Sequence, residues 1–182
     1  LQAIVSLITL QQAYVENSRD AELFTRSADR VRSMALVHEQ LYQSNSYAEI
    51  DFGEYLTTLL EEIESSHAEE QRIRFKLEQE SVYLDLHRAV PAGLVVNELI
   101  ANAVKHAPPA PKEIEIRVAL GRRGSMVEIE VANTGGSLPE GFDLENPKGL
   151  GLTLVQTLAG QLRGRLTVSD NGAVRFTLSF PR

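Results

Sequence analysis

The chain has 182 residues, of which 43% are hydrophobic and 24% are charged, and its formal net charge is −7. This composition is typical of a globular protein, and the negative charge argues against nucleic acid or an anionic membrane as a partner. The absence of cysteine excludes disulfides and thiolate metal sites and fits a reducing cytoplasm, and no apolar run reaches the ~18 residues needed for direct membrane insertion.

The first 44 residues predict a helical hairpin. Residues 1–17 place apolar side chains on one side, a polar break follows at residues 18–20, and residues 21–44 keep an apolar spacing of three and four. A short turn between two such helices favours antiparallel packing. Because a lone hairpin cannot bury both apolar faces, we expect either a second copy, which would complete a four-helix bundle, or cover from the following domain.

A mixed α/β region is predicted after a linker at residues 44–52. Residues 53–67 have helical apolar spacing, and residues 73–80 and 81–86 look like short strands. A further helix contains Pro91 near its start and ends at Ala107, because the two prolines that follow cannot continue it.

The helix that ends at Ala107 has two unlike faces. At roughly 100° per residue, its apolar side chains form one stripe, made of Val96, Leu99, Ile100, Ala103, Val104 and Ala107. The opposite side presents a carboxylate, an amide, an ammonium and an imidazole, from Glu98, Asn102, Lys105 and His106. Most such polar rows are solvated faces of surface helices. However, asparagine is a poor helix former, and an amide oxygen beside a carboxylate and a lysine suits a magnesium ion that binds phosphates.

The remaining residues predict an antiparallel sheet and one more helix. Residues 113–120 and 126–133 alternate between apolar and charged residues, which is typical of a hairpin with one buried face. A long loop follows at residues 134–148, then a helix through Leu162, then two strands around the turn Asn171–Gly172. The order is two helices and then a mixed α/β domain.

Glycine occurs at three places after the asparagine-bearing helix. One place follows a strand at residues 133–137, one precedes a helix at 149–151, and one is the turn at 171–173. A bare backbone can approach a flat ring or a phosphate, and the amides at a helix start favour an anion. Each place is a weak signal alone, since such glycines are more often ordinary loops or hairpin turns. Their order along the chain is what favours a phosphate site.

This order of motifs resembles that of an ATPase superfamily that contains gyrase, the mismatch-repair ATPases and the histidine kinases. The matching segments are the N box NELIANAVKHA, the D-x-G-x-G box NTGGS, the second glycine box KGLGL and the G-T-x-F box GAVRF. More closely, the chain resembles sensor histidine kinases of the HWE-like subgroup, whose first helix contains H-R-x-K-N-N followed by L-Q. The segments that support this closer resemblance are LQAIVSLITLQ, RVRSMALVHEQLY and LPEGFDLEN.

The resemblance implies an α+β fold in two parts. A helical hairpin at residues 1–46 would serve dimerisation and phosphotransfer. Residues 47–182 would form an ATP-binding two-layer α/β sandwich of the Bergerat type, with a mixed, mainly antiparallel sheet.

The resemblance also implies roles for the polar row of the helix. Asn102 matches the residue that coordinates Mg²⁺ bound to the phosphates of ATP, and Glu98 matches the acidic position that acts as a general base or orients a nucleophile. Lys105 matches the basic residue near the phosphates, and His106 lies beside it. Such residue types are needed because phosphoryl transfer relies mainly on positioning and charge neutralisation.

The glycine motifs imply the rest of the nucleotide site. Asn133 occupies the position of an aspartate that accepts a hydrogen bond from the adenine amino group, and Gly135 matches the glycine near the base. Gly149 and Gly151, with Leu150 between them, match the pair at the ATP lid and the phosphates.

The adenine end departs from the family pattern. Asn133 replaces an aspartate, and Val174 replaces a threonine that would share a water molecule with that aspartate. The oxygen of an asparagine can still face an amino group, but the hydrogen bond loses its charge assistance. We therefore expect the half of the site that binds the base to be weakened and the half that binds phosphate to be intact.

The family's phospho-accepting histidine should lie a few residues before Leu1. The chain also lacks a start methionine and the charge pattern of a signal peptide. We therefore expect a fragment of a longer cytoplasmic protein, in which the first helix of the hairpin is truncated. As given, the chain lacks the histidine that it would phosphorylate.

Two functions stay open. The first is the homodimeric core of a two-component sensor histidine kinase, which uses ATP and Mg²⁺ and passes phosphate through a histidine to the receiver domain of a response regulator. The second is a degenerate relative that serves as a dimeric regulator-binding scaffold, with ATP use weak or lost. The helical hairpin disfavours a third reading, an ATPase or protein-serine kinase. The first is favoured by retention of the residues implied to act at the phosphates, namely Glu98, Asn102, Lys105, Gly149 and Gly151.

Overall fold

The computed structural model describes residues 2–12, 17–43, 49–66, 73–106, 114–134, 137–147 and 149–182. The helices of these residues are α1 (Gln2–Gln12), α2 (Ser18–Gln43), α3 (Phe52–Ser66), α4 (Leu86–Lys105) and α5 (Leu150–Gln161). The strands are β1 (Ile50–Asp51), β2 (Ile73–Gln79), β3 (Tyr83–Leu84), β4 (Ile114–Arg123), β5 (Met126–Thr134), β6 (Arg165–Asp170) and β7 (Ala173–Pro181).

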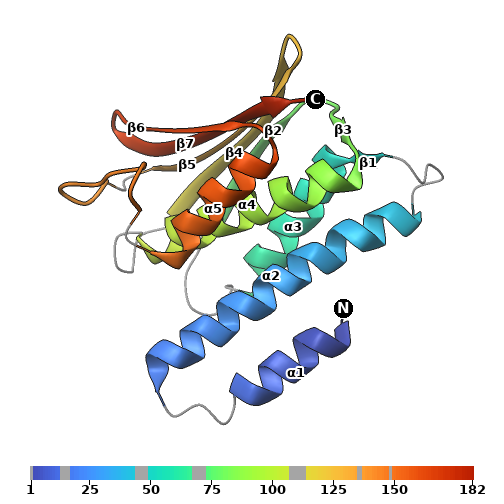
Figure 1. Cartoon of the computed structure of the whole chain (residues 1–182), viewed down its shortest axis with the longest axis vertical. Helices are drawn as coiled ribbons and strands as arrows, with labels where there is room; N and C mark the ends of the chain where they lie inside the picture. The colour runs from blue at the N-terminus through green and yellow to red at the C-terminus, as the bar shows by residue number, and fades with distance from the viewer. Residues whose placement is uncertain are drawn as a thin grey trace.

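Helices α1 and α2 form the predicted hairpin and lie side by side below the rest of the chain (Figure 1). The polar break predicted at residues 18–20 is wrong, because α2 already begins at Ser18. The reason is that serine and aspartate are favoured where helices start, so a polar run there begins a helix as readily as it separates two. The predicted boundary between the two parts at residues 46 and 47 lies outside the described residues and stays a prediction.

The main sheet has five strands in the order β2-β4-β5-β7-β6. Strands β2 and β4 are parallel and the other neighbours are antiparallel, which confirms the mixed, mainly antiparallel sheet. Alternate residues of β4 are buried, namely Ile116, Val118 and Leu120. The opposite face of the sheet has charged pairs such as Arg175 with Glu130, at 2.9 Å. The sheet therefore buries one face, as the alternating pattern predicted.

Helices α3, α4 and α5 cover the buried face of the sheet, and α2 packs on the far side of α4 (Figure 1). Helix α4 is consequently buried on every side from Pro91 to Ile100. Its first turn is capped by the side chain of Asp85, which accepts a hydrogen bond from the amide of Arg88 at 2.9 Å. Pro91 lies in the second turn, near the start of the helix as predicted, and the helix ends at Lys105 rather than Ala107.

A buried hydroxyl pair joins the hairpin to the sandwich. The hydroxyls of Ser33 in α2 and Tyr55 in α3 lie 2.8 Å apart. Burial raises the pKa of the Tyr55 phenol far above its ordinary value. A side chain at Gly93 of α4 would collide with the ring of Tyr55, so glycine is what lets this ring lie between the three helices.

Candidate functional site

A cavity of about 510 Å³ lies where the end of α4 meets β5, β7, the start of α5 and the loop at residues 137–147. Eight of the ten positions assigned from the sequence line it: Asn102, Lys105, His106, Asn133, Gly149, Leu150, Gly151 and Val174. Glu98 lines a neighbouring cavity instead, and Gly135 lies outside the described residues. The fold thus brings residues of all four sequence motifs to one place.

One end of this cavity is formed by Asn133, which is 5% exposed. Its amide nitrogen Nδ2 donates a hydrogen bond to the carbonyl of Ala103 at 3.2 Å. That carbonyl belongs to the last turn of α4, where helix carbonyls lack intrahelical partners. Because a carbonyl only accepts, the contact fixes which way the amide points. The oxygen Oδ1 is then buried without a hydrogen-bond partner among the described residues, so it is available to accept from a ligand.

The wall beside Asn133 is apolar. Val174 lies directly opposite Asn133 in the register of β5 and β7, and Leu99, Val131 and Phe176 also line the cavity. An acceptor set in an apolar wall suits a flat heteroaromatic ring that bears an amino group.

The other end of the cavity is built around Gly151 in the first turn of α5. A Cβ at this position would lie 2.9 Å from Oε2 of Glu98 and 3.7 Å from Oδ1 of Asn102, so glycine permits this close approach of α5 to α4. The cap residue of α5, Gly149, makes no side-chain cap, which leaves the first amides of the helix open to an anion. Leu150, between the two glycines, lines the cavity and is 71% exposed.

The donor set at this end fits a magnesium ion held jointly with phosphates. The amide nitrogen Nδ2 of Asn102 and the carboxylate oxygen Oε2 of Glu98 are buried without hydrogen-bond partners among the described residues. A phosphate oxygen could accept from the amide, and Asn102 Oδ1 is a hard oxygen donor of the kind Mg²⁺ prefers. Within the described ranges, no group of three or more His, Cys, Asp and Glu side chains could hold a metal ion.

Glu98 is bound to the helical hairpin. Its side chain is 3% exposed, and Oε1 accepts a hydrogen bond from Nε of Arg30 in α2 at 2.5 Å. The part of the polar face of α4 that contains Glu98 is therefore covered by α2 rather than by solvent. The carboxylate predicted to act as a base is, in this conformation, neutralised by an arginine.

The sequence analysis missed Arg26 and Arg30 of α2. Both residues lie on one side of the helix, since they are four residues apart, and both lie near the predicted site. The spacing was visible in the sequence, but nothing in it identified α4 as the element that this side contacts.

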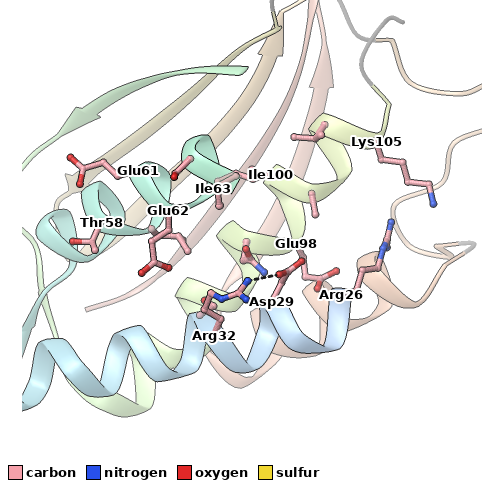
Figure 2. A pocket seen from close by; sticks show the side chains of 16 residues that line it. Arg26, Asp29, Arg32, Thr58, Glu61, Glu62, Ile63, Glu98, Ile100 and Lys105 are labelled. Atoms are coloured by element: carbon pink, nitrogen blue, oxygen red, sulfur yellow. Dashed lines mark hydrogen bonds and ion pairs between the residues drawn. The ribbon is translucent and has the colours of Figure 1, made fainter. Parts of the chain in front are cut away.

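A second cavity, of about 720 Å³, lies between α2, α3 and α4 (Figure 2). Arg26 and Lys105 line both cavities. Glu62 of α3 faces the second cavity, and burial raises the pKa of its carboxyl, while the nearby Arg32 opposes that rise. Helix α2 is thus packed closely against α4 but is separated from part of α3.

The loop at residues 137–147 is held to the rest of the site by several contacts. The ring of Phe142 meets the ring of Phe176 edge-on, with centroids 6.2 Å apart. The amide of Leu138 donates to Asp170 at 3.0 Å, and the side-chain amide of Gln156 donates to the carbonyl of Leu144. The loop therefore closes the cavity on the side of β7.

Within the described residues, no helix is long and apolar enough to span a membrane.

Two family models match the chain. Residues 1–67 match a family described as histidine kinase. Residues 88–182, more than half of the chain, match a family described as histidine kinase-, DNA gyrase B- and HSP90-like ATPase. The first match covers the hairpin, and the second covers both ends of the cavity.

The chain is similar to curated sensor kinases. It is 31% identical over 172 residues to the sensor histidine kinase PdtaS of Mycobacterium tuberculosis (strain ATCC 25618 / H37Rv), a match that covers 93% of this chain and 34% of that protein. It is 25% identical over 179 residues to the blue-light-activated histidine kinase 2 of Erythrobacter litoralis (strain HTCC2594), covering 94% of this chain and 50% of that protein. The chain thus spans a third to a half of the length of these relatives.

Solved structures show the same fold. The histidine kinase domain of the Erythrobacter litoralis EL346 blue-light activated histidine kinase superposes with a TM-score of 0.77 at 20% identity, covering 100% of this chain and 96% of that one. The Acinetobacter baumannii histidine kinase AdeS gives a TM-score of 0.62 at 19% identity, covering 98% and 93%. The predicted hairpin followed by an ATPase-type sandwich is confirmed.

The contact between Arg30 and Glu98 can be tested through stability. Arg30→Gln leaves a buried carboxylate without its counter-charge, so we expect the free energy of unfolding to fall by ~3 kcal/mol. Adding Glu98→Gln removes that charge and should recover at least ~1 kcal/mol of the loss. Urea denaturation followed by circular dichroism measures both.

Arg32→Gln is the matched control. Arg32 lies on the same helix and pairs with Asp29 at 2.9 Å, but its side chain is 52% exposed, so the expected loss is below ~0.5 kcal/mol. Strictly additive effects of Arg30→Gln and Glu98→Gln would mean that the two residues do not stabilise one another.

Proposed function

Because the chain belongs to the histidine kinase family, we propose that it is the core of a cytoplasmic sensor kinase that binds ATP with Mg²⁺. In this proposal the γ-phosphate passes to a histidine and then to the receiver domain of a response regulator. The observation that supports the proposal best is the cavity in which eight predicted residues meet, with an acceptor for a base at one end and phosphate-binding groups at the other.

Each end of the cavity has a distinct task in this proposal. Asn133 Oδ1 accepts from the amino group of adenine, while the amides at the start of α5 and the ammonium of Lys105 bind phosphate oxygens. Asn102 Oδ1 is the protein ligand of Mg²⁺, and the ion, when bound, neutralises charge on the phosphates. Glu98 is the general base, and it becomes free to take a proton only when Arg30 moves away.

The alternative is the degenerate regulator-binding scaffold. The pairing of Glu98 with Arg30 favours it, since a base held by an arginine does not take protons. Nucleotide binding separates the two functions, because a scaffold has no need of ATP.

We further propose that the protein acts as a homodimer through its hairpin. Among the side chains of α1 that the structure describes, the large apolar ones that are exposed are Ile4, Leu7 and Leu10, with exposures of 48%, 61% and 61%. They lie three residues apart and so form a side that a second copy could cover.

The magnesium role of Asn102 is tested by calorimetric titration with ATP, with and without Mg²⁺. We expect the wild type to bind ATP more tightly with Mg²⁺ than without it. In Asn102→Ala the ion loses its protein ligand, so the affinity for ATP in the presence of Mg²⁺ should fall at least about tenfold, or ~1.4 kcal/mol. Binding in the presence of a chelator should change little.

Asn97→Ala is the control for Asn102→Ala, since Asn97 lies on the same helix but lines only the second cavity. If ATP binding depends equally on Mg²⁺ in Asn102→Ala and in the wild type, Asn102 does not bind the ion. No ATP binding by the wild type would favour the scaffold.

The orientation of Asn133 gives a separate prediction. In Asn133→Asp the residue can no longer donate to the Ala103 carbonyl and places a carboxylate beside it, so we expect a loss of ~1–3 kcal/mol in unfolding free energy and weaker ATP binding. Asn171→Asp adds the same charge at the exposed β6–β7 turn and should change stability by less than ~0.5 kcal/mol. Tighter ATP binding by Asn133→Asp, at unchanged stability, would contradict the assigned orientation.

Dimerisation is tested by light scattering at high micromolar concentration. Replacing both Leu7 and Leu10 by glutamine removes apolar area that the partner would cover, so the dimer dissociation constant should rise at least about tenfold. Ser6→Gln, on the same helix, should leave the mass unchanged. A monomeric wild type would rule out the proposed assembly.

A further inference from the structure

Two cations from different parts of the chain meet at the phosphate end of the cavity. Arg26 comes from α2 and Lys105 from the last turn of α4, and Figure 2 shows their side chains reaching toward one another. Both residues line both cavities, so they lie where the two cavities join. Asn133 lines only the smaller cavity, which places the two cations away from the end that accepts the base. Two positive charges at one end of a cavity attract an anion there.

The guanidinium of Arg26 lies close to the backbone that would bind phosphate. Its Nη1 atom is 3.6 Å from the position that a Cβ of Gly151 would occupy, a point that is also 3.7 Å from Oδ1 of Asn102. The first turn of α5, the amide of Asn102 and an arginine of the hairpin therefore surround one small volume. The carboxylate of Glu98 also reaches this point, but Arg30 already provides its counter-charge.

We propose that Arg26 is a phosphate-binding residue that the helical hairpin contributes to the nucleotide site. This inference rests on the proposed function, since it assigns the terminal phosphate of a nucleoside triphosphate to Arg26 and Lys105. A guanidinium suits this task because its planar set of donors matches two phosphate oxygens at once. In this assignment a diphosphate lacks the phosphate group that Arg26 binds. The triphosphate therefore bridges α2 and the sandwich, whereas the diphosphate contacts the sandwich alone.

Paired titrations with a non-hydrolysable ATP analogue and with ADP, both with Mg²⁺, test this assignment on the full chain. Arg26→Gln should weaken binding of the ATP analogue by about tenfold and change ADP binding by less than about twofold, because only the triphosphate contacts the guanidinium. Arg26→Lys keeps the charge but not the fork of donors, so it should recover part of the loss. Arg32→Gln, on the same helix but lining only the second cavity, should leave both affinities unchanged.

The outcomes are distinct. If the wild type binds the ATP analogue and Arg26→Gln lowers the affinities for the analogue and for ADP equally, or lowers neither, the role of Arg26 is overturned. The proposed function then still holds. A wild type that binds neither nucleotide overturns both. Circular dichroism checks the helix content of each variant, and if Arg26→Gln does not fold, the ratio of the two affinities in Arg26→Lys decides in its place.

Discussion

The arrangement of the whole chain depends on how the carboxylate of Glu98 is compensated. An ionised carboxylate buried in a helix interface costs several kcal/mol unless a cation and hydrogen bonds accompany it. Arg30 supplies the cation from a helix 68 residues earlier in the chain. Helices α2 and α4 must therefore pack with this pair in register, and one turn further along α2 the buried hydroxyls of Ser33 and Tyr55 join the same helix to α3. Of the polar side chains of α4, Glu98 therefore contacts the hairpin, while Asn102, Lys105 and His106 line the cavity.

The sequence was sufficient to predict the fold class and most of the candidate site. That Asn102, Asn133 and Gly151 would lie at one cavity was predictable, because their motifs follow one another in the order of a known superfamily. The alternating pattern of the strands predicted which sheet face is buried. The surroundings of Glu98 were not predictable in this way. Helical periodicity shows that a residue lies on a polar face, but it does not show which distant element covers that face.

Asn133 shows how a departure from a family pattern can have a local structural cause. The expectation of a weakened base site treated the asparagine only as a poorer acceptor than aspartate. In the structure its amide nitrogen satisfies a carbonyl in the last turn of α4, which an ionised aspartate could not do, and its oxygen still faces the cavity. The residue thus combines a helix-capping contact with a free acceptor. The sequence could not indicate this, because Ala103 contributes only its backbone.

Helix α2 is hydrogen-bonded to α3 near its middle, and this position determines how its two ends can move relative to one another. At ~1.5 Å per residue, its ends lie ~22 Å and ~15 Å from Ser33, the residue bonded to Tyr55. The cavity beside α3 leaves room around that point. If α2 tilted as a rigid body about Ser33, a tilt of ~10° would move Ser18 by ~4 Å and would move Gln43 by ~3 Å in the opposite direction. A displacement of Ser18 would then reach Gln43 with its direction reversed.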